Sequence, residues 1–179
     1  AYNIKRSNVS GGPYTTVAPL VTATSYLDTG LSASTTYYYV ISAVNAAGGE
    51  SADSAEAGQI TRPATTAGLS VMAGNTRAIL SWTATFGATS YNVKRATTSG
   101  GPYTTVASNV TTTGYTNTSL VNGTTYYYVV SSVNAGGEGF NSTQATITPQ
   151  SITVIKDNSD STGITITGTW TTSTSIAGY

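Results

Sequence analysis

The sequence contains no cysteine and no histidine among its 179 residues. The absence of cysteine excludes disulfide cross-links and thiolate metal sites, and the absence of histidine excludes His-based catalytic triads and histidine metal ligands. Charge is also scarce, since only 8% of the residues are charged and seven basic residues balance seven acidic ones. A net charge of zero leaves no electrostatic footprint for nucleic acid. No apolar run is long enough for a transmembrane helix, so we expect no membrane partner.

The few carboxylates form no pattern that predicts catalysis. Asp53 and Glu56 lie in the first half of the chain, and Asp157 and Asp160 lie in a turn-rich stretch near its end. A glycosidase needs two carboxylates that face each other across a cleft, about 5–10 Å apart, and nothing in the sequence places two of them in this way. We interpret all four as solvated loop carboxylates. We predict no catalytic residue, no cofactor and no enzymatic activity for this chain.

The loop around Asp157 also has the composition of a calcium site. Residues 157–161 read Asp-Asn-Ser-Asp-Ser, which supplies oxygen ligands but lacks the spacing and the distal glutamate of an EF-hand loop. Asn, Asp and Ser favour turns as well. We predict a turn and no metal site, and the sequence leaves calcium binding by Asp157 and Asp160 open.

What the sequence does contain is an internal repeat. Residues 2–18 and 91–107 are identical at 13 of 17 positions, at an offset of 89 residues. The offset continues into the Thr-Thr-Tyr-Tyr-Tyr-Val runs at 35–40 and 124–129. Such a period indicates two copies of a unit of about 90 residues, which is within the usual size of one domain. Arrays of small domains are usually spacers, scaffolds or binding modules.

The second copy has the pattern of an all-β sandwich. Its apolar runs are short, alternate with polar residues and are separated by Gly, Pro and Asn. Alternation places Leu80 and Trp82 on one face of a strand, and it points Tyr91 and Val93 inward from the next strand. The predicted strands span residues 69–72, 78–82, 91–95, 103–106, 114–116, 124–133 and 140–148.

The longest predicted strand of each copy carries a more specific pattern. In the second copy it is Leu120-x3-Thr124-x-Tyr126-x-Tyr128-x-Val130-x3-Asn134, and in the first it is Leu31, Thr35, Tyr37, Tyr39, Ile41 and Asn45. This spacing resembles the signature of the fibronectin type III family, whose fold is an immunoglobulin-like β-sandwich. The resemblance implies that Tyr37 and Tyr126 are tyrosine-corner residues, with hydroxyls bonded to the backbone just upstream. It also implies that Trp82, Tyr91 and Tyr128 are structural core residues.

The repeat divides the chain into segments. Because Tyr2 matches Tyr91 in the third strand of the family's fold, the first copy is predicted to lack its first two strands. The predicted segments are a partial type III domain at 1–62, a linker at 63–67, a complete type III domain at 68–149, and the β-hairpin-like start of a further β-domain at 150–179.

Two interpretations of the final segment stay open. It resembles the start of a golvesin/xanthan lyase C-terminal-like β-domain, which is found behind the catalytic modules of bacterial polysaccharide-degrading enzymes. Alternatively, Trp170 and Tyr179 have the spacing of Trp82 and Tyr91, so the segment is the start of a third type III domain. In that case it supplies the strands missing from residues 1–62, within one chain or between chains.

Alternation also separates the tyrosines of each triplet. Tyr37 and Tyr39 share the inward face, whereas Tyr38, and Tyr127 in the second copy, point outward. Pyranose rings stack on exposed aromatic faces, so Tyr38, Tyr127 and Trp170 are the candidate glycan-stacking residues. The alternative is that the outward tyrosines are cross-strand partners that stabilise the sheet by about 0.2–1 kcal/mol each. For Trp170 the alternative is a place in a core.

The resemblance implies a function as well as a fold. Type III domains with similar strings occur in bacterial extracellular enzymes that degrade polysaccharides. We therefore expect a secreted, extracellular, non-catalytic spacer or scaffold with weak glycan binding, attached to a larger carbohydrate-active protein. Its expected partners are polysaccharide and flanking domains of the same polypeptide. The alternative is a surface adhesin or filament subunit, whose incomplete sandwich is completed by strand donation from a neighbouring copy. The sequence leaves the glycan, the attached domain, the organism and the oligomeric state open.

Overall fold

The structure is a computed structural model that describes residues 1–151, 153–155 and 165–167. Every regular element in these residues is a β-strand, so the expected all-β fold is confirmed. Strands of the first unit are β1 (Tyr2–Ser7), β2 (Thr15–Val21), β3 (Thr36–Ala43) and β4 (Ala57–Ile60). Strands of the second unit are β5 (Ser70–Gly74), β6 (Arg77–Ser81), β7 (Ser90–Ala96), β8 (Thr104–Val110), β9 (Gly114–Asn117), β10 (Tyr126–Asn134), β11 (Gly137–Glu138) and β12 (Ala145–Ile147). The described part of the chain holds no helix that is long and apolar enough to span a membrane.

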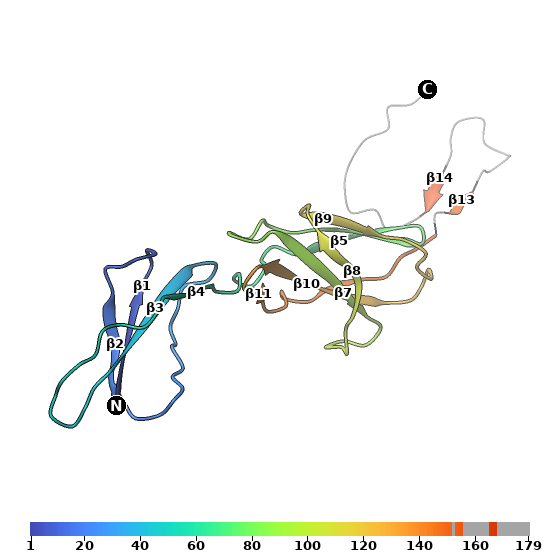
Figure 1. The fold of residues 1–179 in the computed structure, drawn as a ribbon. Coiled ribbons are helices and arrows are strands. Elements are labelled where there is room, and N and C mark those ends of the chain that lie inside the picture. Colours follow the sequence, from blue (N-terminus) through green and yellow to red (C-terminus); the bar gives the residue numbers. More distant parts are fainter. Residues whose placement is uncertain (152, 156–164, 168–179) are drawn as a thin grey trace.

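The second unit is a sandwich of two antiparallel sheets (Figure 1). One sheet has the order β11-β10-β7-β8, with β12 also paired to β10, and the other has the order β5-β6-β9. Their inner faces bury Leu80 and Trp82 from the second predicted strand against Tyr91 and Val93 from the third. The rings of Trp82 and Tyr91 meet edge to face, with centroids 5.4 Å apart. Such a pair adds about 0.5–1.5 kcal/mol to the burial of apolar area.

The first unit is a single four-stranded sheet in the order β2-β1-β3-β4. Tyr2 lies opposite Ala43, and their equivalents Tyr91 and Ser132 lie opposite each other in the second unit. The 89-residue repeat in the sequence is therefore a repeat of strand register. Among residues 1–62 no counterpart of the sheet β5-β6-β9 is formed. The segment 25–28, which is equivalent to β9, crosses the sheet without a strand partner.

The strand predicted at 140–148 is interrupted. Within this range the structure forms only β12, at Ala145–Ile147, and β11 ends at Glu138, before the range begins. Between the two strands, Ser142 takes the place of a regular ladder contact. The Ser142 amide donates to the Val130 carbonyl at 2.8 Å, and the Val130 amide donates to the Ser142 hydroxyl at 3.0 Å. A serine hydroxyl that takes the place of a backbone carbonyl competes with sheet formation, which breaks the strand.

Residues 63–67, expected as a linker, lie against the second unit (Figure 1). Thr66 is buried, and the Ser132 hydroxyl donates to the Ala64 carbonyl at 2.8 Å. The Asn134 amide group donates to the Thr61 carbonyl at 3.0 Å just before this segment. These bonds fix the path of the chain into the second unit, because backbone carbonyls near a sheet edge need partners.

A direct contact also joins the two units. The Ser34 hydroxyl of the first unit donates to the Phe86 carbonyl of the second at 2.9 Å. Beyond the second unit, β13 (Thr153–Ile155) and β14 (Thr165–Thr167) pair as an antiparallel hairpin. Trp170, Asp157 and Asp160 lie outside the described residues.

Candidate functional site

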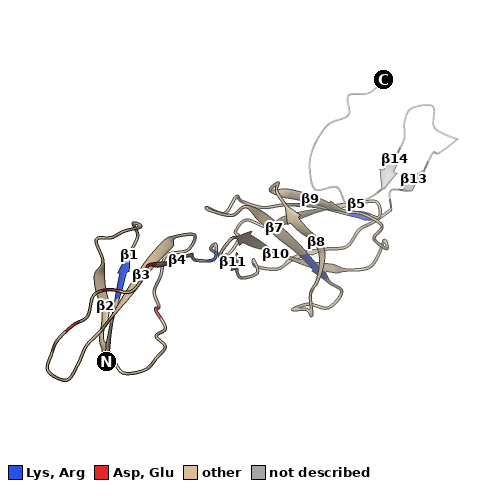
Figure 2. Ribbon diagram, viewed as in Figure 1, with Lys and Arg blue, Asp and Glu red and all other residues tan. Residues whose placement is uncertain are grey.

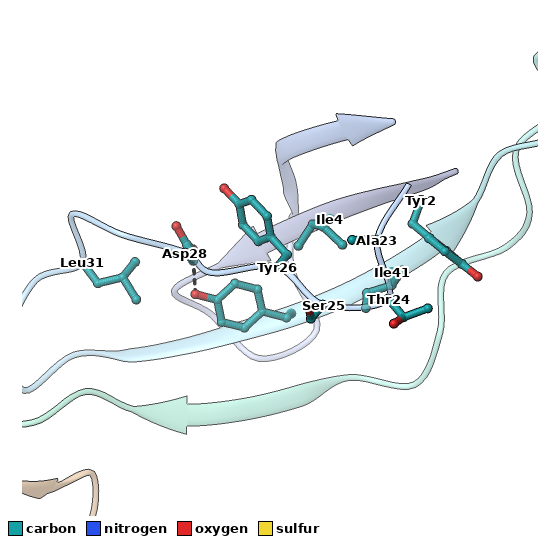
Figure 3. Close-up of a pocket in the computed structure, with 10 residues that line it drawn as sticks. Tyr2, Ile4, Ala23, Thr24, Ser25, Tyr26, Asp28, Leu31 and Ile41 are labelled. Carbon is teal, nitrogen blue, oxygen red and sulfur yellow. Dashed lines mark hydrogen bonds between the residues drawn. The ribbon is translucent and has the colours of Figure 1, made fainter. Parts of the chain in front are cut away.

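The inner face of the first unit carries a hollow. Its volume is about 530 Å³, and it lies between the sheet and the segment that crosses it (Figure 3). The segment contributes Tyr26 and Asp28, and the strands contribute Tyr2, Ile4 and Ile41. The remaining lining residues are Ala23, Thr24, Ser25, Leu31 and Tyr39.

Side chains on the inner face of the first unit are more exposed than their equivalents in the second unit. Tyr2 is 38% exposed, whereas its equivalent Tyr91 is 5% exposed. Ile41 is 43% exposed, and its equivalent Val130 is fully buried. In the second unit β5 and β6 cover these positions, and residues 1–62 form no such strands. The apolar inner face of the first unit is therefore more exposed than the equivalent face of the second.

Asp28 is the one charged group that lines the hollow, and it is fully partnered. Its carboxylate accepts hydrogen bonds from Arg6 Nη1 and the Tyr39 hydroxyl, each at 2.8 Å. Burial raises the pKa of Asp28, but the bonds from Tyr39 and Arg6 outweigh it, so the pKa lies below its usual range. Burial and the bond to Asp28 raise the pKa of Tyr39 to about 12. The group therefore stays an ion pair with a neutral tyrosine over the physiological pH range.

The second unit repeats this arrangement with an amide. Asn117 Oδ1 accepts hydrogen bonds from Arg95 at 2.9 Å and from Tyr128 at 2.8 Å. In each unit the arginine also lies over the corner tyrosine, 5.1 Å from the centroid of Tyr37 or Tyr126. Sequence analysis did not identify Asp28 or Asn117. The signal that would have found them is their separation of 89 residues, two positions after the equivalent Tyr26 and Tyr115.

The corner tyrosines make the bonds that their family role requires. The Ser32 amide donates to the Tyr37 hydroxyl at 3.0 Å, and the Val121 amide donates to the Tyr126 hydroxyl at 3.1 Å. Both rings are buried. These bonds fix the loop that precedes β3 or β10 to its own strand.

The outward tyrosines lie on the opposite face of each unit. Tyr38 is half-buried and packs over Gly58 of the neighbouring strand, where a Cβ would lie 2.8 Å from the ring. Tyr127 is half-buried on β10, with Ala96 and Thr146 as its cross-strand neighbours. Both rings therefore keep part of their surface in water while resting on small residues.

A second cluster on this face surrounds Glu56. Its carboxylate accepts hydrogen bonds from the Ser10 hydroxyl and the Gly11 amide, each at 2.7 Å, and from the Tyr14 hydroxyl. These three bonds, with Tyr14 first, lower the pKa of Glu56. Gln144 takes the same place in the second unit. Glu56 is exposed, as expected of a solvated loop carboxylate, and its bonds also fasten the Gly-Gly-Pro-Tyr loop to the start of the last strand.

A third centre of charge in the first unit is Lys5 on β1, the strand that has a basic stretch in Figure 2. Its ammonium lies 2.8 Å from Glu50 and 2.7 Å from Asp53. Hydrogen bonds from Lys5 and Ser42 lower the pKa of Glu50 to about 2. Asp53 is thus also partnered and not free in solution. In the second unit Lys94 pairs with Glu138 at 2.6 Å.

The described residues hold no group of three or more His, Cys, Asp and Glu side chains that would suit a metal ion. Each carboxylate of the first unit forms a hydrogen bond or an ion pair within that unit. The inner and outer faces of its sheet therefore present no free carboxylate from the described residues. The buried indole of Trp82, whose N–H finds no acceptor among the described residues, belongs to the core and not to a site.

Comparison with known proteins assigns the second unit. The family model for the fibronectin type III domain matches residues 63–148. The crystal structure of an Fn3-like protein from Clostridium thermocellum matches this chain with 48% sequence identity and a TM-score of 0.43. The match covers 50% of this chain and 92% of the Clostridium protein's chain. The chain belongs to the fibronectin type III family through these residues.

The curated relatives are much longer than this chain. An amylopullulanase from Thermoanaerobacter thermohydrosulfuricus is 41% identical over 78 residues, which is 44% of this chain and 5% of that protein. An amylopullulanase from Thermoanaerobacterium saccharolyticum is 38% identical over 78 residues, which is 44% of this chain and 6% of that protein. The similarity thus concerns about a twentieth of each relative's length.

Proposed function

We propose that the chain is a non-catalytic accessory region of a larger secreted bacterial protein that acts on polysaccharide. The observation that carries this proposal is the similarity of its type III domain to a short stretch of bacterial amylopullulanases. Type III sandwiches host many functions, so the fold alone does not select one. The enzyme context of the relatives makes an extracellular setting the natural one for this chain.

We extend the proposal to the flanking segments. The matched register of β1–β3 and β7–β10 supports a second type III domain at 1–62 that lacks its first two strands. For residues 150–179 we propose the start of a golvesin/xanthan lyase C-terminal-like domain. In this arrangement the two units hold flanking domains at a fixed separation, since hydrogen bonds from Ser34 and Asn134 restrain the junction.

Weak glycan contact is the second part of the proposal. Tyr38 and Tyr127 each present a ring that rests on small neighbours and stays partly in water, a geometry that suits stacking on a pyranose. A platform of two rings on one chain would give weak binding that flanking domains strengthen through effective concentration.

Affinity electrophoresis in gels with pullulan or amylopectin tests the platform. We expect Tyr38→Ala and Tyr127→Ala to move faster than wild type in the polysaccharide gel, and Tyr38→Phe to move like wild type. Phe140→Ala is a matched control, because Phe140 is 78% exposed on a loop away from the two tyrosines' strand positions. If the alanine variants and wild type are retarded equally, these tyrosines do not bind glycan.

The open inner face favours one alternative function. A filament or adhesin subunit would have its incomplete first unit completed by a strand from a neighbouring chain, as strand addition completes other sheets. Light scattering after size-exclusion chromatography at several concentrations tests this alternative. A mass that rises with concentration supports it, and a constant monomer mass rejects it.

A further inference from the structure

We propose that the outer face of the first unit binds a neutral polysaccharide chain through two tyrosine rings, Tyr14 and Tyr38, with the Glu56 carboxylate beside them as a hydrogen-bond acceptor. The inference rests on the glycan contact proposed above and deepens it in two ways. It adds Tyr14 to the platform, and it names the chemical class of the glycan.

Each of the two rings rests against a glycine. A Cβ at Gly12 would lie 2.9 Å from the Tyr14 ring, and a Cβ at Gly58 would lie 2.8 Å from the Tyr38 ring. Because glycine has no side chain, each ring lies close to the backbone on one side. Both tyrosines are half-buried, so part of each ring stays in water. A flat aromatic surface held in this way suits the apolar face of a sugar ring.

Glu56 brings the two rings together on one face of the sheet. The Tyr14 hydroxyl donates to its carboxylate. Glu56 lies two positions before Gly58, and residues two apart in a strand point to the same side, about 7 Å from each other. Gly58 in turn lies opposite Tyr38 in the pairing of β3 with β4. The Tyr14 hydroxyl and the Tyr38 ring are therefore neighbours on the outer face.

The Glu56 carboxylate keeps room for one more hydrogen bond. A carboxylate has about four lone-pair sites, and the bonds from Ser10, Gly11 and Tyr14 occupy three of them. These bonds, with Tyr14 first, lower the pKa of Glu56, so it stays ionised at neutral pH. A sugar hydroxyl is a donor that fits the remaining site, and a hydrogen bond to a charged acceptor is stronger than one between neutral groups.

The charge of this face favours a glycan that carries none. Lys5 contributes one ammonium group, whereas Glu50, Asp53 and Glu56 contribute three carboxylates. A uronic acid in the glycan would bring a further carboxylate next to Glu56, and the two like charges would repel each other. A neutral sugar meets no such repulsion and still offers its hydroxyl groups to the carboxylate.

Frontal affinity chromatography of the full chain on immobilised pullulan tests the role of Tyr14. The parent chain for this test carries Tyr103→Ala and Tyr127→Ala, which remove the equivalent rings of the second unit. We expect Tyr14→Ala to lower the association constant of this parent by about two- to tenfold, as for the loss of one aromatic contact. Tyr14→Phe is the matched control, because it keeps the ring and removes only the bond to Glu56. It should bind within about twofold of the parent.

A column of carboxymethyl pullulan tests the class of glycan, because this polymer has the pullulan backbone with added carboxylates. We expect the parent chain to bind it at least about threefold more weakly than pullulan at low ionic strength, and the difference to shrink in physiological salt. Glu56→Gln gives the first unit the uncharged side chain that the second has in Gln144, with the same shape. This variant should bind the two polymers more nearly alike.

Three results would overturn the inference and leave the wider glycan proposal standing. One is pullulan binding by Tyr14→Ala that equals that of the parent. Another is an equal loss for Tyr14→Phe and Tyr14→Ala, which would show that Tyr14 only holds its own loop. The third is equal binding of pullulan and carboxymethyl pullulan by the parent at low salt. A wild-type chain that neither column retains rejects the glycan proposal itself, and a wild type retained without its parent confines binding to the second unit and rejects the inference.

Discussion

The Asp28 carboxylate of the first unit and the Asn117 side chain of the second accept the same pair of hydrogen bonds, one from an arginine and one from a tyrosine. The two side chains have nearly the same shape, and they differ in charge. The second unit thus satisfies its half-buried arginine with a neutral acceptor, whereas the first forms an ion pair. Glu56 and Gln144 differ in the same way on the outer face.

Because the first unit has Asp28 and Glu56 where the second has Asn117 and Gln144, we expect the first unit to lose stability at a higher pH than the second. The pKa values of Asp28 and Glu56 are lowered by folding, and their places in the second unit are taken by neutral side chains. The pKa of Glu50 is lowered to about 2, and that of Glu138 in the second unit is lowered as well. A carboxylate with a lowered pKa stabilises the folded state above its unfolded pKa, and this stability is lost as the pH falls toward the folded pKa. We expect the amides of β1 to lose hydrogen-exchange protection between about pH 4.5 and 2, ahead of those of β7.

The double variant Asp28→Asn with Glu56→Gln is the matched control for this difference. It gives the first unit the neutral acceptors of the second, so β1 should keep its protection to a lower pH. Simultaneous loss of protection in β1 and β7 in the wild type would contradict the prediction.

The corner tyrosines predict a second measurable effect. Tyr126→Phe removes the hydroxyl that accepts the Val121 amide, and we expect it to lower the free energy of unfolding by about 0.5–1.5 kcal/mol. Urea denaturation measures the change. Tyr127→Phe should cost less than this, because the Tyr127 hydroxyl makes no hydrogen bond within the described part of the chain. Equal losses for the two variants would show that the corner bond contributes no stability.

Truncation of a core side chain is expected to lower the free energy of unfolding more than loss of the corner hydroxyl does. Leu80 is 1% exposed and contacts the residues that close the sandwich, so Leu80→Ala should destabilise the second unit by about 2–5 kcal/mol. Met72→Ala on β5 is the control, since Met72 is 61% exposed and its truncation should stay within about 0.5 kcal/mol. Thermal unfolding of the two variants distinguishes these outcomes, and similar melting temperatures would contradict the described packing.

The close contact of Gly136 with the chain that connects the two units predicts that a larger side chain there changes the distance between the units. A Cβ at Gly136 would lie 2.3 Å from the Ile60 carbonyl oxygen, so Gly136→Ala has to push the connecting chain away. Distances between spin labels placed in the two units should broaden in this variant, while the melting temperature of the second unit changes little. Ala135→Ser, at a neighbouring exposed position, should leave the distribution as in wild type. An unchanged distribution in Gly136→Ala would show that this contact does not hold the units together.

Much of the fold could be predicted from the sequence because its signals are local. Alternation in residues 91–95 predicted two inward side chains, and Tyr91 and Val93 are both buried. The 89-residue offset predicted two copies of one unit, and the strand pairings of Tyr2 and Tyr91 have the same register. Both signals depend only on the period of the strand and on identity at equivalent positions.

What the sequence could not supply depends on contacts between distant positions. The break at Ser142 arises because a hydroxyl takes the place of a ladder carbonyl, and the sequence does not distinguish it from Ser42 or Ser131, which lie in regular strands. Asp28 looks like any loop carboxylate until the fold brings Arg6 and Tyr39 to it. The packing of residues 63–67 likewise follows from carbonyl acceptors that only the folded second unit provides.

Three of the basic residues in the described part of the chain are paired within their own unit. Lys5, Arg6 and Lys94 each face an acidic group of their own unit, so little field extends beyond the Debye length of about 8 Å at physiological ionic strength. An encounter without electrostatic steering proceeds at about 10⁵–10⁶ M⁻¹s⁻¹. Association through either face should thus depend little on ionic strength.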